Sequence, residues 1–201
     1  MAALALLRQA RLDAAKNRER PDPDLDNPYP ALFLANGSRT IENVLDLVEE
    51  FPGQGATTLL GGKDAWKHAS RLNAQNSPVL WTIDLPEKPK TDEELKIQSS
   101  EERPYWQPPS KLRDEKRALD AEAVSGFAKL QDSGVECALV PGGSASNFEK
   151  NVTRLRESGL TDETIWKALS LDVQTLLWGE HSWRKSGATA NLVIHRGPVN
   201  L

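Results

Sequence analysis

Short apolar runs alternate along the chain with segments whose apolar residues recur at the spacing of an amphipathic helix. The four runs lie at residues 31–36, 56–61, 78–84 and 135–140. Gly, Pro or Asn residues bound each run, as is typical of strands that end in turns. Because the connections are too long for hairpins, the pattern predicts parallel strands joined by right-handed crossovers, which is an α/β fold.

Two further segments, 18–30 and 86–116, are rich in proline and charged residues. The second is longer than most structureless loops in compact domains, which is typical of a functional lid or a surface loop. Tyr105 and Trp106 would anchor this loop at one point. We therefore expect one α/β domain over residues 1–180 with a loop at 86–116.

The stretch LVPGGSASNFEKN, residues 139–151, has the pattern of a strand, a glycine-rich turn and a helix. Many α/β proteins keep a catalytic or phosphate-binding group in such a turn. Ser146 and Glu149 form a capping box, which predicts that the helix begins at Ser146. Thr161 is expected to cap a second, short helix in the same way.

The charge distribution argues against nucleic acid as a partner. The 201 residues include 25 Lys and Arg against 29 Asp and Glu, a net charge of -4, and the basic residues are scattered rather than arranged in a stripe. No apolar run approaches the roughly 20 residues of a membrane-spanning helix, so no membrane partner is expected. The N-terminal MAALALLRQARLDAAK lacks the basic start of a signal peptide, which makes a cytoplasmic protein the default expectation.

Few residue types are placed for chemistry. Cys137, the single cysteine, lies in the apolar run VECALV and is expected to be a buried thiol rather than a nucleophile. His68 lies on a predicted helix, where packing or solvent exposure is expected rather than metal binding, and His181 and His195 lie in the C-terminal turn and strand. Asp84 ends the third strand and is the candidate catalytic residue, although it could equally hydrogen-bond its own loop.

Two glycine pairs follow predicted strands, Gly61 with Gly62 and Gly142 with Gly143. Each pair precedes a predicted helix whose first N–H groups could bind an anion, such as phosphate or a sugar acid, without a metal. Neither pair is followed by the Lys-Ser/Thr of a P-loop. The glycine turns are therefore candidate anion-binding sites built from the backbone.

The C-terminal run ESGLTDETIWKALSLDVQTLLWGEHSWRKSGATANLVIHRGPV resembles the end of the amidohydrolase superfamily. Members of that superfamily close with the pattern GLT-x-E-x-A-L-x-x-x-T-x-x-x-A-x-x-L-G, a glycine turn and A-D/N-L-V-V. The matching residues are Gly159, Leu160, Thr161, Glu163, Leu169, Leu177, Gly179, Gly187, Ala190, Asn191, Leu192 and Val193. The segments RTIENVLDLVEEF, GGKDAWKHASRL and PVLW are similar, in order, to the second half of imidazolonepropionase-related amidohydrolases.

The resemblance implies that the four strands are the fifth to eighth of a (β/α)8 barrel and that residues 181–201 return as a strand of a small β-sandwich. The first half of such a barrel, with its His-x-His pair, would lie outside this chain. The remaining metal ligands of the family would fall at or beside Leu34, Gly61 and Gly142, which cannot bind a metal. Since a catalytic zinc needs about three His or carboxylate donors, zinc or another divalent metal would require ligands from a complementary half.

The function implied by the resemblance is hydrolysis of carbon–nitrogen bonds other than peptide bonds, with this chain inactive alone. One alternative is a non-catalytic structural or interaction half-barrel, or a truncated gene remnant. A second is a metal-free module that binds an anion or a sugar acid at the glycine turns. Because a half-barrel would expose strand edges and an apolar face, we expect an N-terminal half-barrel partner or a homodimer.

Overall fold

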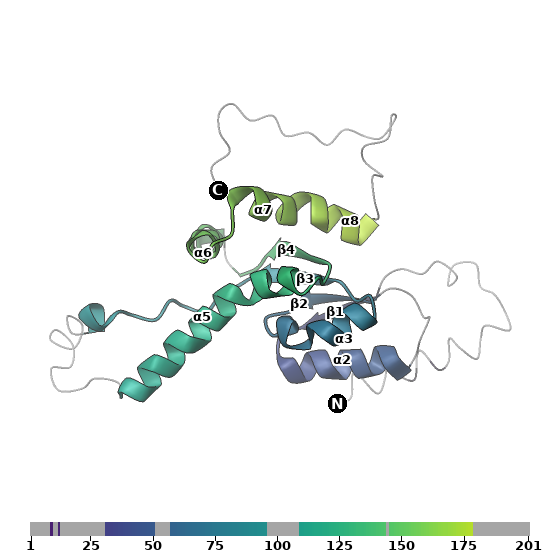
Figure 1. Ribbon diagram of the computed structural model, residues 1–201, viewed down its shortest axis with the longest axis horizontal. Helices are drawn as coiled ribbons and strands as arrows, with labels where there is room; N and C mark the ends of the chain where they lie inside the picture. The colour runs from purple at the N-terminus through teal and green to yellow at the C-terminus, as the bar shows by residue number, and fades with distance from the viewer. Residues whose placement is uncertain are drawn as a thin grey trace, which may run out of the picture.

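The computed structural model describes residues 31–50, 57–95, 109–143 and 145–178, together with Gln9 and Leu12. Its four strands are β1 (Ala31–Ala35), β2 (Thr57–Gly61), β3 (Val79–Ile83) and β4 (Cys137–Pro141). They form one sheet in the order β1-β2-β3-β4, and every neighbouring pair is parallel (Figure 1). The predicted α/β class is confirmed, and each strand lies within two residues of its expected range.

Helices connect successive strands, because parallel neighbours cannot be joined by a hairpin. The α-helices are α2 (Ser38–Glu50), α3 (Ala69–Ala74), α5 (Ser110–Asp132), α6 (Ala145–Glu157), α7 (Asp162–Lys167) and α8 (Val173–Trp178). A short 3₁₀ helix, η1 (Ala65–His68), precedes α3, and a π-helix, η2 (Ala168–Asp172), joins α7 to α8. The alternation of strands and helices is therefore the one that the apolar pattern predicts.

The hydrophobic core lies on one face of the sheet. Side chains of alternate strand residues point to this face, and they pack against the helices. The core residues without accessible surface include Ala35, Leu59, Trp81 and Leu139 of the strands and Ile41, Leu45, Leu72, Phe127 and Leu155 of the helices. The rings of Trp81 and Phe127 lie 5.9 Å apart and tilted, which joins β3 to α5.

The other face of the sheet is open at β1. Leu32 and Leu34 point to this face and are 51% and 69% exposed, whereas Leu80, which shares the face on β3, is buried. A helix layer on one face and an uncovered strand on the other are what half of a (β/α)8 barrel would have. The strand expected within residues 181–201 lies outside the described residues.

The two edges of the sheet differ. α7, η2 and α8 run beside β4 on the side away from β3 (Figure 1), and η2 and α8 contact that strand directly. Among the described elements, β1 has its main contacts with β2 and α2 only. Within the described residues β1 has a strand on one side only, so β1 is the edge at which a further strand could be added.

The start of α5 corrects the loop expected at 86–116. The helix begins at Ser110, so residues 110–116 are helical, and residues 92–95 form a helical turn within the same expected loop. The stretch KLRDEK at the start of α5 is nearly all charged, so it lacks the apolar periodicity on which the prediction rests. Tyr105 and Trp106, the expected anchor of this loop, lie outside the described residues.

Of the two predicted helix starts, the cap at Thr161 is confirmed and the start at Ser146 is wrong by one residue. Thr161 caps α7, because its Oγ1 accepts a hydrogen bond of 3.2 Å from the N–H of Thr164, as predicted. α6 begins at Ala145, one residue before Ser146, so Ser146 lies inside the helix rather than at its N-cap. The capping box located this helix correctly but placed its first residue too late.

Candidate functional site

The carboxyl ends of the four strands meet at one edge of the sheet, which we call the carboxyl edge. In α/β folds this edge is where binding and catalytic groups gather. Leu34 lies near the end of β1, Gly61 ends β2, Asp84 follows β3 and Gly142 follows β4. The positions singled out from the sequence therefore lie on neighbouring strands at the same edge.

Asp84 is held between a lysine and the second glycine turn. Lys63 Nζ lies 3.9 Å from Asp84 Oδ2, and the two side chains are 38% and 54% exposed. A Cβ at Gly143 would lie 3.1 Å from Asp84 Oδ1, and one at Gly142 would lie 3.1 Å from Asp84 Cβ. Gly143 also has a φ of 69°, a conformation that L side chains rarely adopt. The glycines thus leave the space that the Asp84 carboxylate occupies.

The chemistry available around Asp84 is that of one carboxylate and one ammonium group, from Asp84 and Lys63. The Asp84 N–H donates to the carbonyl of Thr82 at 2.8 Å, so a tight turn fixes where this side chain leaves the backbone. An acid–base pair of carboxylates would need a second acidic group beside Asp84. Within the described residues, no group of three or more His, Cys, Asp or Glu side chains is placed to hold a metal ion.

Backbone hydrogen bonds and close packing hold the first glycine turn, Gly61 with Gly62, in place. The Gly62 N–H donates to the carbonyl of Ala35 at 2.8 Å, and the Ala65 N–H donates to the carbonyl of Gly62 at 3.0 Å. A Cβ at Gly62, whose φ is 65°, would lie 2.6 Å from Val79 Cγ1. Close packing therefore accounts for this glycine, and anion binding at either glycine turn stays a prediction.

The structure also brings together four polar residues that the sequence did not connect. The Ser38 N–H donates to Asp64 Oδ2 at 3.0 Å, and Ser38 Oγ lies 2.6 Å from His68 Nε2. Asp64 Oδ1 in turn accepts from Lys67 Nζ at 2.9 Å. A carboxylate from the next loop thus satisfies the N-terminus of α2, where the helix dipole favours negative charge. His68 is half-buried in this contact, in agreement with the packing role expected for it.

Cys137 is buried at the start of β4, as expected from its apolar neighbours. Burial, together with the nearby charge of Asp172, raises the pKa of its thiol from 9.0 to about 12. Burial also raises the pKa of Asp172, which Lys167 partly offsets. Since the thiolate is the reactive form, Cys137 is an unreactive packing residue in the folded protein.

The buried thiol predicts a loss of stability at alkaline pH. Above a pH of about 9 the unfolded chain ionises Cys137 while the folded protein keeps it protonated, so each further pH unit up to about 12 lowers the free energy of unfolding by about 1.4 kcal/mol. Urea unfolding at about pH 8 and about pH 10 measures this slope. Cys137→Ala is the control, and it should show a smaller decrease. Equal decreases in both proteins would contradict the prediction.

None of the helices within the described part of the chain is both long enough and apolar enough to cross a membrane. Comparisons of the chain with protein-family models, with curated proteins and with solved structures give no match. The fold and the carboxyl edge are therefore the observations on which a function is proposed.

Proposed function

We propose that this chain is one half of an amidohydrolase-type (β/α)8 barrel. It would take part in hydrolysis of carbon–nitrogen bonds other than peptide bonds only with a complementary half-barrel, and it would be inactive alone. The observation that carries the proposal is the order of the sheet, whose four parallel strands follow chain order with helices between them and whose second face is open at β1. That arrangement is expected of four consecutive units of such a barrel.

The open edge and face of β1 support a complementary half-barrel as the partner. A parallel strand added beside β1, which has no second strand neighbour within the described residues, would cover Leu32 and Leu34. Full burial of an exposed leucine contributes about 1.5–3 kcal/mol, so these two residues alone would favour association substantially. Because α7, η2 and α8 lie beside β4, the partner would join at β1.

The metal of such an enzyme does not fit the residues of this half. The expected ligand positions Leu34, Gly61 and Gly142 carry no donor side chain, and the described residues offer no alternative cluster of donors. The complementary half would therefore supply the metal ligands. This half would contribute Asp84 and Lys63, which lie at the carboxyl edge where a substrate would bind.

Light scattering tests the assembly. We expect the isolated wild-type chain to self-associate through β1, and we expect Leu34→Lys to reduce this association because it places a charge on the open face. Leu119→Lys is the matched control, since Leu119 is also a strongly exposed leucine but lies on α5. A monodisperse wild-type monomer that Leu34→Lys leaves unchanged would count against a half-barrel.

Activity measurements distinguish the proposal from its alternatives. The chain is expressed alone and together with the product of the reading frame upstream of it, and each sample is assayed for bound zinc and for hydrolysis of cyclic amides. Zinc and hydrolysis that require both chains would support the proposal. Assembly without hydrolysis would favour the non-catalytic half-barrel, and stoichiometric zinc in the isolated chain would contradict the proposal.

A further inference from the structure

Ser38 and His68 form a polar contact at the carboxyl edge that the proposed barrel function does not use. Ser38 follows β1 as the first residue of α2, and His68 ends η1, which follows β2. Both residues therefore lie beyond the carboxyl ends of neighbouring parallel strands, where the catalytic groups of α/β folds gather. Each is half-buried, so part of its surface is accessible to a small molecule.

The distance between the two side chains is that of a nucleophile and its base. Ser38 Oγ lies 2.6 Å from His68 Nε2. A general base must lie within about 2.6–3.2 Å of the group whose proton it takes. In the histidine tautomer that carries its proton on Nδ1, Nε2 accepts the hydrogen bond from the Ser38 O–H. The hydroxyl proton can therefore pass directly to His68 when Ser38 Oγ attacks a substrate.

The backbone of Ser38 is fixed before any substrate binds. Its N–H donates to Asp64 Oδ2 at 3.0 Å, so the loop after β2 holds the start of α2. Lys67 Nζ donates to the other oxygen, Asp64 Oδ1, at 2.9 Å and offsets the charge of this carboxylate. A nucleophile that is already held in position does not have to be ordered by its substrate, which lowers the barrier to reaction.

The first turn of α2 leaves one N–H group available beside the serine. The first N–H groups of an α-helix have no partner inside the helix. Here the N–H of Ser38 donates to Asp64, and those of residues 40–41 donate to the carbonyl of Gly37 at 2.9 and 3.1 Å. The Arg39 N–H has no hydrogen-bond partner among the described residues. In α/β-hydrolases the N–H of the residue after the nucleophile binds the oxyanion, and Arg39 has that position.

We propose that Ser38 and His68 act as nucleophile and general base in the hydrolysis of small carboxylic esters. Ser38 Oγ attacks the ester carbonyl carbon and passes its proton to His68 Nε2, while the carbonyl oxygen becomes an oxyanion that accepts from the Arg39 N–H. The bond from the carbonyl carbon to the alcohol oxygen then breaks, and the alcohol leaves with the proton from His68. Water, deprotonated by the same base, releases the carboxylic acid and restores Ser38.

The surroundings of His68 limit the substrates. No side chain among the described residues is hydrogen-bonded to His68 Nδ1. In a Ser-His-Asp triad the carboxylate at that position orients the imidazole and stabilises its charged form. We therefore expect reaction with esters of good leaving groups and not with amides. This reaction needs neither a metal nor a complementary half, so it is separate from the carbon–nitrogen hydrolysis proposed above.

Reaction of the full chain with p-nitrophenyl acetate and with a fluorophosphonate probe, both in the presence of EDTA, tests the proposal. We expect an initial burst of p-nitrophenol, and mass spectrometry should place the acetyl and phosphonyl groups on Ser38. Ser38→Ala should lose both reactions. Ser158→Ala is the matched control and should keep them, since Ser158 is an accessible serine whose Oγ donates to the carbonyl of Leu155 at 2.7 Å. Equal labelling of the two variants would overturn the proposal.

His68→Gln distinguishes a base from a purely structural contact. Glutamine can keep a hydrogen bond to Ser38 Oγ, but it cannot take up the hydroxyl proton. We therefore expect His68→Gln to keep the circular dichroism spectrum and the urea midpoint of the wild type, while the rate of fluorophosphonate labelling falls at least about 100-fold. An unchanged labelling rate in this variant, or no labelling of Ser38 in the wild type, would show that the contact only holds α2 in place.

Discussion

Replacing Trp81 with alanine is expected to lower the free energy of unfolding by about 3–5 kcal/mol. The indole has no accessible surface, lies on β3 in the middle of the core and stacks at an angle on Phe127 of α5. Alanine would leave a cavity between the sheet and α5 that the neighbouring strands and helices can fill only in part. Urea unfolding followed by circular dichroism measures the loss.

Trp81→Phe shows how much of the lost stability comes from the volume of the ring and how much from its buried N–H group. Trp81 Nε1 is buried and has no hydrogen-bond partner in the described structure. An unsatisfied buried donor costs about 1–3 kcal/mol, so phenylalanine removes this cost while it retains most of the packing. We therefore expect Trp81→Phe to lose much less stability than Trp81→Ala. Similar losses for the two variants would show that Nε1 has a partner that the structure does not reveal.

The strands were predictable because parallel strands that are buried on both faces have continuous apolar runs in the sequence. β3 reads VLWTI and β2 reads TTLLG, and in both the residues of the core-facing side are buried while neighbours on the other side are buried or nearly so. Strands buried in this way appear as continuous apolar runs rather than as alternating ones. The parallel order follows from the helical segments between the runs, since each crossover needs one.

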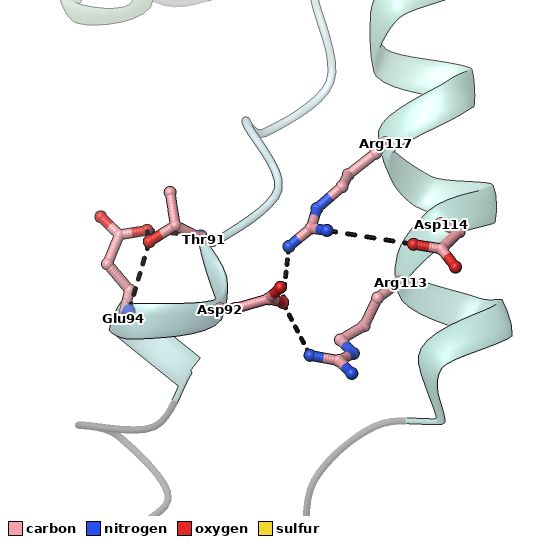
Figure 2. A network of polar contacts seen from close by, with 6 residues as sticks. All are labelled: Thr91, Asp92, Glu94, Arg113, Asp114 and Arg117. Carbon is pink, nitrogen blue, oxygen red and sulfur yellow. Dashed lines mark hydrogen bonds and ion pairs between the residues drawn. The ribbon is translucent and has the colours of Figure 1, made fainter.

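The first turns of α5 could not be predicted in the same way. Apolar periodicity reports that one face of a helix is buried, and it does not report helicity itself. The N-terminal half of α5 extends away from the sheet (Figure 1), and Arg113 and Arg117 on it form ion pairs with Asp92, in the segment that follows β3 (Figure 2). Those partners are 21 and 25 residues apart, so the pairing depends on the fold.

In the candidate site, too, some features were predictable from the sequence and others were not. Asp84 and the turn at Gly142 and Gly143 could be placed at one edge because the carboxyl ends of parallel strands converge. The proximity of Lys63 to Asp84, and the contact of Ser38 with His68, depend on side-chain directions in loops that the pattern of apolar residues does not specify. Sequence reasoning therefore located the edge but not the polar partners on it.

Replacing Arg154 with methionine is expected to destabilise the protein by about 3–5 kcal/mol, because it leaves a buried carboxylate without a partner. The side chains of Arg154 and Asp120 are only 10% and 17% exposed. The substitution also removes the hydrogen bond to the carbonyl of Pro86, which attaches the segment after β3 to α6. Urea unfolding followed by circular dichroism measures the loss.

A double substitution distinguishes the charge from the packing of this residue. Arg154→Met combined with Asp120→Leu removes both charges, and such apolar replacements of buried pairs are often neutral, so most of the lost stability should return. Lys88→Met is the control, since Lys88 and Glu157 are 65% and 59% exposed and such pairs contribute at most about 1 kcal/mol. If the losses of Arg154→Met and Asp120→Leu, each measured alone, simply add in the double variant, the two side chains are not coupled. The stability that Arg154 contributes would then come from its hydrogen bond to the carbonyl of Pro86 and from its packing.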